Sequence, residues 1–275
     1  MWTENNIQTG WKFPPTPDTY NQYWEKRKHQ YPLDDNDINE FGNISKILDE
    51  KGYYVIKNLF TSEEIDTLYD QTEKYFRVED KSVLRHKKVD QPLINSPEII
   101  PYVFNDYSFR IAMSYMKCYP AIGTLNFRKS FVNDMEEEGV QLFHIDPNSP
   151  RFIKFFLYLN DVDEKGGPFC IVEGSGHSKH HNRYQYHRWP EEEIINHYGE
   201  DSIKYITAKK GDMIVATTCN YHRGVKCVEN ERTMLTLNYV IHPEEFRPPT
   251  FQMRQSDIDK LPDYKKPLTD FLIPV

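Results

Sequence analysis

GDMIVATTCNYHRGVKCVENERTMLTLNYVI, residues 211–241, contains two apolar runs rich in β-branched residues, at 212–217 and 232–241. Such runs, bounded by Gly, Asn and Asp, are typical of β-strands. Similar short runs recur between residue 121 and this segment, at 122–131, 140–145, 152–159, 168–172 and 203–207. Many short strands separated by turn residues predict a β-sandwich or a β-barrel.

The first 120 residues have a different character, and we predict an N-terminal arm followed by helices. Residues 1–40 show no clear periodicity and read as an extended arm. Thr61 and Glu64 fit a helix capping box, and apolar side chains at helical spacing follow over 62–77. The other predicted elements are a helix over 43–51 that ends at Gly52, a strand over 53–56, a loop over 78–95, a helical stretch from 96 that breaks at Pro101, and a helix over 106–117.

Helices first and strands later predict one mainly β domain with flanking α-helices over residues 1–275. Its parts are the N-terminal arm and helices (1–120), a β core (121–245) and a C-terminal extension (246–275). The strand pattern is interrupted at 173–202, which carries five histidines and a helix predicted over 190–198. Long insertions in compact domains are often functional, so we expect this segment to form a lid over the core.

Composition excludes several classes of function. The net charge is −8 and no run of Lys and Arg exceeds three, which argues against nucleic-acid binding and membrane-surface binding. The sequence contains no stretch of about 18 apolar residues, so we expect no transmembrane helix. The N-terminus lacks the pattern of a signal peptide. The four cysteines form no CxxC pair, so we expect reduced thiols in a cytoplasmic protein.

Three residues that are distant in sequence form a candidate metal site. His144 and Asp146 are two apart at a strand end, where side chains at i and i+2 point to the same face. His222 follows 76 residues after Asp146 (222 − 146). Two histidines and one carboxylate are typical of non-haem iron(II) oxygenases, whereas catalytic zinc more often takes three histidines, two histidines with a glutamate, or cysteines.

Cationic residues on the predicted strands are candidate anion ligands. Arg232 opens the apolar run 232–241, ten residues after His222 (232 − 222). A buried guanidinium is costly without an anion and suits a bidentate pair with a carboxylate, although an isolated strand-edge Arg can also extend to solvent. Arg128, Lys129 and Lys154 either bind an anionic group of a substrate or pair with the acidic surface, and the sequence leaves both alternatives open.

The chain resembles the phytanoyl-CoA dioxygenase-like family of iron(II)- and 2-oxoglutarate-dependent oxygenases. The matching segments, in the family's order, are GYYVIKNLFTSEEID at 52–66, QLFHID at 141–146, FFLYLNDVDEKGGPFCIVEGSGH at 155–177 and GDMIVATTCNYHRGVKCVENERTMLTLNYV at 211–240. The resemblance implies a double-stranded β-helix core, that is, a jelly-roll of cupin-like type, over 121–245. It also implies iron(II) on His144, Asp146 and His222, the distal carboxylate of 2-oxoglutarate on Arg232, and a further contact to 2-oxoglutarate from Gln141.

What the resemblance implies about activity is a dioxygenase that hydroxylates a small-molecule substrate with molecular oxygen and releases succinate and carbon dioxide. The chain departs from the family's pattern at Gly176, an insertion before His177, and at Phe169 and Gly224, where relatives carry hydroxyl residues. We expect His177 to tie a turn and Trp189 to pack in the core. Two alternatives remain: a cupin-like metalloenzyme that does not use 2-oxoglutarate, and a non-enzymatic jelly-roll binding module.

Overall fold

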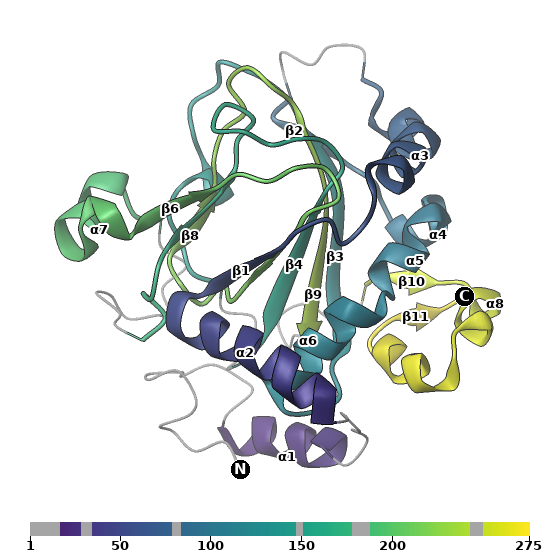
Figure 1. The fold of residues 1–275 in the computed structure, drawn as a ribbon. Helices are drawn as coiled ribbons and strands as arrows, with labels where there is room; N and C mark the ends of the chain where they lie inside the picture. Colours follow the sequence, from purple (N-terminus) through teal and green to yellow (C-terminus); the bar gives the residue numbers. More distant parts are fainter. Residues whose placement is uncertain (1–16, 29–34, 79–83, 147–150, 178–187, 243–249) are drawn as a thin grey trace.

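The computed structural model describes residues 17–28, 35–78, 84–146, 151–177, 188–242 and 250–275 (Figure 1). Helices dominate before residue 120 and strands after it. The elements of the first part are α1 (Pro17–Lys28), α2 (Asp35–Lys51), β1 (Tyr53–Ile56), α3 (Ser62–Thr72), η1 (Glu73–Phe76), β2 (His86–Lys88), α4 (Pro92–Asn95), η2 (Pro97–Ile99), α5 (Ile100–Val103) and α6 (Asp106–Met116).

The larger sheet has six strands in the order β1-β7-β4-β9-β3-β2, and all neighbours are antiparallel. Its remaining strands are β3 (Ala121–Ser130), β4 (Ile153–Tyr158), β7 (Met213–Ala216) and β9 (Arg232–Val240). These four strands coincide with predicted apolar runs. β1 and β2 come from the part of the chain before residue 121 and form the two edges of the sheet.

A smaller antiparallel sheet faces it, with the order β6-β5-β8. Its strands are β5 (Phe169–Val172), β6 (Ile203–Ile206) and β8 (His222–Gly224). Apolar side chains from the two sheets meet between them: Phe156 of β4 stacks on Phe169 of β5 with ring centroids 4.8 Å apart. Two facing antiparallel sheets with flanking helices confirm the predicted jelly-roll fold class.

Helices cover the other face of the larger sheet. Phe155 and Leu157 of β4, Val215 of β7 and Leu237 of β9 lie in one buried cluster with apolar residues of α2, α3 and α6. Because successive strand residues point to opposite faces, Lys154, Phe156 and Tyr158 of β4 face the smaller sheet instead. The side chains of β4 therefore alternate between two layers. One is an apolar layer that faces the helices, and the other is the space between the two sheets, which also contains charged side chains.

The first half of the chain differs from the sequence-based expectations in several places. The expected arm contains α1, and α2 begins at Asp35 rather than residue 43, so much of the arm is helical. Pro101, where the helical stretch was expected to break, lies within α5. The expected loop 78–95 contains β2 and α4. The Thr61–Glu64 capping box is present, but the helix after it becomes a 3-10 turn at Glu73, so it is shorter than the 62–77 expected.

One later segment differs as well, and another agrees. The expected strand 140–145 is instead a 3-10 turn, η3 (Gly139–Gln141), followed by single bridges at Phe143 and His144. Within the expected lid, α7 (Glu191–Tyr198) is present as predicted and is followed by η4 (Glu200–Ser202). His180, His181 and His187 lie outside the described residues.

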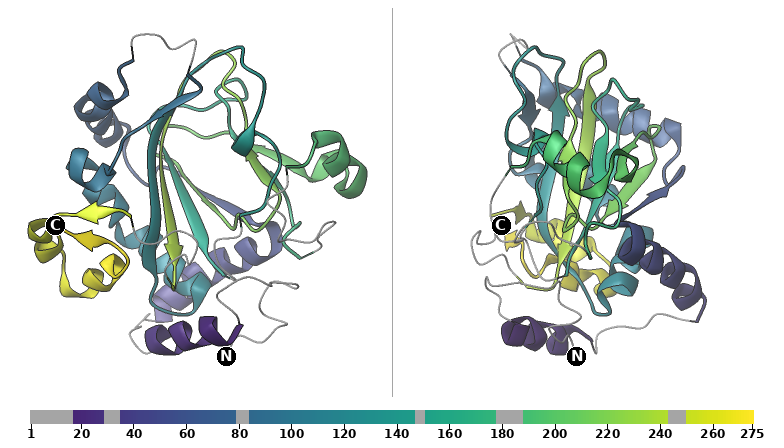
Figure 2. Two further views of the ribbon diagram at one scale, coloured as in Figure 1. Left: turned by 180° about the vertical axis from the view of Figure 1, so that it is seen from behind. Right: turned by 90° about the vertical axis from the view of Figure 1, so that its left-hand side faces the viewer.

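The C-terminal extension consists of β10 (Gln252–Met253), α8 (Gln255–Lys260), η5 (Asp263–Thr269) and β11 (Ile273–Pro274), with β10 and β11 parallel. The extension lies beside α4 and on the side of the β core opposite α7 (Figures 1 and 2). The Gln91 side chain links it to the body, since its amide donates to Thr250 O and its carbonyl accepts from Gln252 N. Among the described residues, no helix combines the length and the apolar character needed to span a membrane.

Candidate metal centre and cavity

His144, Asp146 and His222 come together between the two sheets. Each offers one ligand atom, and these atoms all lie within 4.8 Å of one another. Nε2 of His222 lies 3.3 Å from Asp146 Oδ2, and Nε2 of His144 lies 3.8 Å from Asp146 Oδ1. Adjacent ligands of an octahedral ion with bonds of about 2.1 Å are about 3 Å apart, so small side-chain adjustments suffice to hold a divalent cation.

Backbone pairing sets this arrangement. His144 and His222 form a bridge in which each amide donates to the other's carbonyl, at 3.0 and 2.9 Å, so the segment before Asp146 runs alongside β8. The Asp146 amide donates to Thr218 O at 2.9 Å. The two histidines therefore sit opposite each other in an antiparallel register, and their ring centroids are 4.2 Å apart.

Each imidazole is oriented by its own chain. Nδ1 of His144 lies 2.9 Å from Leu142 O, and Nδ1 of His222 lies 2.9 Å from Asn220 O. A carbonyl can only accept, so Nδ1 carries a proton in both rings and Nε2 is the ring atom that faces Asp146. Hydrogen bonds of this kind commonly fix the orientation of metal-ligating histidines.

The protonation states suit a cation. Burial, and to a smaller extent His222, lowers the pKa of His144 to about 3, so its imidazole is neutral at neutral pH. Burial alone would raise the pKa of Asp146, but Lys154 and the two histidines outweigh burial and hold it well below its ordinary value. Metal binding requires neutral imidazole and ionised carboxylate, and no proton has to leave these two groups.

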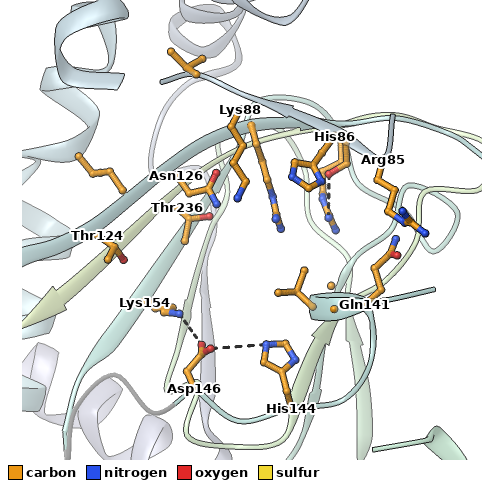
Figure 3. Close-up of a pocket in the computed structure, with 18 of the residues that line it drawn as sticks. Arg85, His86, Lys88, Thr124, Asn126, Gln141, His144, Asp146, Lys154 and Thr236 are labelled. Carbon is orange, nitrogen blue, oxygen red and sulfur yellow. Dashed lines mark hydrogen bonds and ion pairs between the residues drawn. The ribbon is translucent and has the colours of Figure 1, made fainter. Parts of the chain in front are cut away.

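Lys154 of β4 is the direct neighbour of this carboxylate. Its Nζ lies 2.6 Å from Asp146 Oδ2. The contact fixes the carboxylate from the side of the larger sheet, and Figure 3 shows Lys154 reaching toward Asp146. The centre is therefore held by both sheets: the smaller sheet provides His222 and the larger provides the cation that positions Asp146.

Two cavities that share several lining residues open on the centre. The inner one, of about 140 Å³, is lined by all three candidate ligands together with Phe169 and Tyr158. The outer one, of about 920 Å³, is lined by His144 and Asp146 and extends to β2 and the C-terminal extension. Its volume lies in the range of small-molecule sites, about 300–1,000 Å³.

Arg232, the predicted anion ligand, lines both cavities and is buried. Its Nη2 lies 3.5 Å from Ser130 Oγ, and its buried Nε has no hydrogen-bond partner within the described parts of the chain. Gln141 also lines the outer cavity, but its side-chain oxygen accepts from the Glu138 amide at 3.3 Å. The structure thus places both predicted co-substrate residues at the cavity. Of the two, only Arg232 has a buried polar atom, Nε, without a hydrogen-bond partner among the described residues.

The three strand cations that the sequence left open have different surroundings. Lys129 lies 3.0 Å from Glu231 and 2.8 Å from the Tyr69 hydroxyl, on the helix-facing side of β3. Lys154 is paired with Asp146. Arg128 lines both cavities and has no hydrogen bond or ion pair to any described residue.

Two further predicted roles concern residues outside the centre. The His177 ring bonds to Asp49 O, which ties the turn after β5 to α2, as expected for a structural histidine. Trp189 is buried against Tyr221, with ring centroids 4.9 Å apart. Neither residue takes part in the ligand cluster, which is the one such group found within the described ranges.

Sequence reasoning missed one wall of the cavity. Arg85, His86 and Lys88 lie across the cavity from His144 and Asp146 (Figure 3). They belong to the charged segment 78–95, which reads as a loop because it contains few apolar residues. One feature of the sequence could have revealed this wall. If the segment is a strand, residues i and i+2 point to the same face, so His86 and Lys88 share one face and Lys87 lies on the other.

Comparisons with known proteins agree with this architecture. No protein-family description matches the chain, and no curated protein matches it. Among solved structures, the non-heme alpha-ketoglutarate-dependent epimerase SnoN from nogalamycin biosynthesis has a TM-score of 0.56 at 13% identity, covering 73% of this chain and 82% of its own. HygX from Streptomyces hygroscopicus, solved with nickel, 2-oxoglutarate and hygromycin B, gives 0.53 at 14%, covering 82% and 92%. EctD from S. alaskensis, solved with 2-oxoglutarate and 5-hydroxyectoine, gives 0.54 at 16%, covering 77% and 79%. At these identities the likeness shows that the chain has the fold of these enzymes.

Proposed function

We propose that the protein is an iron(II)- and 2-oxoglutarate-dependent dioxygenase that hydroxylates a small-molecule substrate. The proposal includes its placement among the phytanoyl-CoA dioxygenase-like enzymes, which rests on the segments at 52–66, 141–146, 155–177 and 211–240. The observation that carries it is the pair of imidazoles, each with Nε2 turned toward the Asp146 carboxylate.

The donor set fits iron(II). His144, Asp146 and His222 supply two nitrogens and one oxygen, and this set leaves room for other ligands on an octahedral ion. Cysteine is absent from the ligand cluster. Iron(II) bound there supplies the activation of oxygen that couples decarboxylation of 2-oxoglutarate to oxidation of the substrate.

Arg232 is the residue that fits the co-substrate. Its buried guanidinium lines the same inner cavity as the three ligands, and its Nε has no partner among the described residues. A planar guanidinium pairs with a carboxylate through two parallel hydrogen bonds. We therefore assign the distal carboxylate of 2-oxoglutarate to Arg232, with Gln141 as a second polar contact from the cavity wall.

The surrounding residues orient the reactants and exclude water. Phe156, Tyr158, Phe169 and Met234 line the inner cavity with apolar surface, which strengthens electrostatic contacts there. The Tyr158 hydroxyl accepts a hydrogen bond from the Phe169 amide, so this polar atom is satisfied inside the wall. Lys154 holds Asp146 in place when a cation binds.

Anaerobic calorimetry with manganese(II) as a stable substitute for iron(II) tests the proposal. We expect one metal ion per chain, then binding of 2-oxoglutarate only to the metal-loaded protein. His144→Ala removes one of two imidazole donors and should weaken metal binding by about 100-fold or more. With iron(II) and oxygen, slow release of succinate from 2-oxoglutarate should be measurable for the wild type.

His197→Ala is the matched control, because His197 is an exposed histidine of α7 outside the cluster. This variant should bind metal as the wild type does. Metal binding without any binding of 2-oxoglutarate would instead favour a metalloenzyme that does not use this co-substrate. Absence of metal binding by the folded wild type would leave a binding module.

A further inference from the structure

Three cationic side chains form a row across neighbouring strands on the inner face of the larger sheet. Lys88 of β2 is the direct cross-strand partner of Arg128 of β3. Arg232 of β9 pairs with Ser130, two residues along from Arg128, so Arg128 and Arg232 are diagonal neighbours on the same face. Figure 3 shows Lys88 pointing into the cavity beside Asn126.

The protein does not neutralise the middle member of this row. Arg85 at the cavity mouth lies 2.8 Å from Glu138, and Lys154 lies 2.6 Å from Asp146. In the proposed function, 2-oxoglutarate neutralises Arg232. Arg128 lacks a hydrogen bond or ion pair to any described residue, and its Nε is buried.

This arrangement is costly without an anion. Burial, and then the nearby Arg232, lowers the pKa of Arg128 to about 10, so the guanidinium remains charged at neutral pH. Like charges directly opposite each other on a sheet are destabilising, and a buried unpaired charge is more so. The same positive field contributes to lowering the pKa of His86 to about 4, after burial, with Arg128 and Lys88 as the main charged causes. His86 is therefore neutral at neutral pH and adds no further charge to the row.

The position of Arg128 also separates two binding regions. It lines the inner cavity with the metal ligands and the outer cavity of about 920 Å³ with Lys88. A Cβ at Gly224 would lie 3.7 Å from Arg232 Nη2 and 3.9 Å from Arg128 Nη2, so both guanidinium groups end above the same glycine. An anion on Arg128 would thus sit beside the co-substrate, with its organic part in the outer cavity.

We propose that Arg128, with Lys88 beside it, binds a carboxylate or phosphate group of the primary substrate, so that the enzyme oxidises an anionic small molecule. This inference rests on the proposed function, because it assigns Arg232 to 2-oxoglutarate. Arg128 is then the residue that sets the substrate class, and the oxidised carbon lies between the anionic group and the metal centre. The competing assignment gives both guanidinium groups to the co-substrate.

Calorimetry on four proteins separates these assignments: the wild type, Arg128→Gln, Arg232→Gln and Lys87→Gln. Lys87 is the matched control, because it lies between His86 and Lys88 but bonds to Arg77 O away from the cavity. Each protein is loaded with manganese(II) and titrated first with 2-oxoglutarate. The saturated complex is then titrated with inorganic phosphate and with butyrate, which represent the two kinds of anion.

We expect Arg128→Gln to weaken binding of phosphate or butyrate by about tenfold or more, and Lys87→Gln to leave it within about twofold. Whichever of the two probes shows this dependence identifies the kind of anion. The affinity for 2-oxoglutarate should change by less than about threefold in Arg128→Gln, but fall by about tenfold or more in Arg232→Gln. Equal loss of 2-oxoglutarate affinity in both variants would assign Arg128 to the co-substrate and overturn the proposal, as would probe binding that does not depend on Arg128.

Thermal unfolding of the ligand-free proteins is a second, independent measurement. Arg128→Gln removes a partly buried charge next to two like charges, so its melting temperature should equal or exceed that of the wild type. A clear loss of stability would mean that Arg128 is a structural residue with a partner, against the proposal. If 2-oxoglutarate does not bind the metal-loaded wild type, the proposed function fails, and the Arg128 site is judged from the same two probes on the metal-loaded protein alone.

Discussion

At the scale of single residues, Lys154 has the clearest energetic role. Its Nζ lies 2.6 Å from Asp146 Oδ2, and among the charged groups it is the main cause of the lowered pKa of that carboxyl. In metal-free protein, Lys154→Met should reduce the free energy of unfolding at pH 7 by about 1–3 kcal/mol, because it leaves a mostly buried carboxylate without its cation. Urea unfolding in the presence of a chelator measures this difference.

The pH dependence of that difference follows from the depressed pKa of Asp146. A carboxyl whose pKa is lower in the folded state contributes stability that is present above its unfolded pKa of about 3.9 and is lost as the pH falls through the folded value. The gap between wild type and Lys154→Met should be constant from pH 7 to about 5 and shrink below about 4. Lys210→Met, which breaks the exposed pair with Asp66, should cost less than about 1 kcal/mol. A gap that widens toward acid pH would contradict this account.

The sequence could predict which side chains meet, but not which of them lack partners. The sequence allowed us to predict His144, Asp146 and His222 as one site. A strand places residues i and i+2 on the same face, and the apolar run 212–217 ends shortly before His222. Arg128, Lys129 and Lys154 look alike in sequence, since all three lie on predicted strands. Their different surroundings depend on Glu231, Tyr69 and Asp146, which the fold brings from other elements.

At the scale of elements, the turn between β7 and β8 orients the second histidine. Asn220 O accepts from His222 Nδ1, while its side chain donates to Thr217 and accepts from the Gly176 amide at 2.5 Å. Gly52 packs against the same side chain: a Cβ there would lie 2.4 Å from Asn220 Nδ2, and its φ is +91°. The turn is therefore fixed by Gly52, at the junction of α2 and β1, together with the segment after β5.

Asn220→Ala tests this turn. Losing several buried hydrogen bonds should lower the free energy of unfolding by about 2–4 kcal/mol. Because the backbone that orients His222 is loosened, manganese(II) affinity should also fall by about 10- to 100-fold. Asn230→Ala changes an exposed turn asparagine that bonds to Asp163, and should leave metal affinity unchanged. Full metal affinity in a destabilised Asn220→Ala protein would show that the turn does not position the ligand.

Elements differ in how well the sequence predicted them, for physical reasons. β4, β5, β7 and β9 are almost wholly buried, so their sequences are nearly continuous apolar runs, while β3 and β6 are partly exposed and still carry β-branched or aromatic residues. β2 and β8 are only three residues long and contain charged residues, so no local pattern separates them from loops. They become strands because β3 and β5 offer free edges to pair with. Helix α2 was expected to start at residue 43, but it continues through Gly42, where the structure leaves open space around the missing Cβ.

At the scale of the whole molecule, we propose that residues 1–275 form one domain. Arg27 of α1 donates to Tyr119 O at 3.1 Å and pairs with Asp270 near the C-terminus at 2.5 Å. A single cluster of buried apolar residues includes α2, α6, the larger sheet and Leu268 of the C-terminal extension. These contacts link the N-terminal helices, the β core and the C-terminal extension.

Thermal unfolding should accordingly show one cooperative transition. Manganese(II) at about 100 times its dissociation constant should stabilise the fold by about 2.7 kcal/mol and move the whole transition upward. Calorimetry with and without a chelator checks both statements, and His144→Ala should abolish the metal-dependent shift. A separate early transition, insensitive to metal, would instead divide the terminal segments from the β core.

Gly224 has a consequence for how selectivity could change in this scaffold. It forms part of the floor beneath two guanidinium groups, and an added methyl group would meet Arg232 and Arg128 only at ordinary van der Waals separations of 3.7 and 3.9 Å. On the proposed assignments of Arg232 and Arg128, a single small substitution would therefore alter the room available to bound carboxylates while every charged side chain stays in place. Preference among acids of different bulk would then be adjustable at a position that itself carries no chemistry.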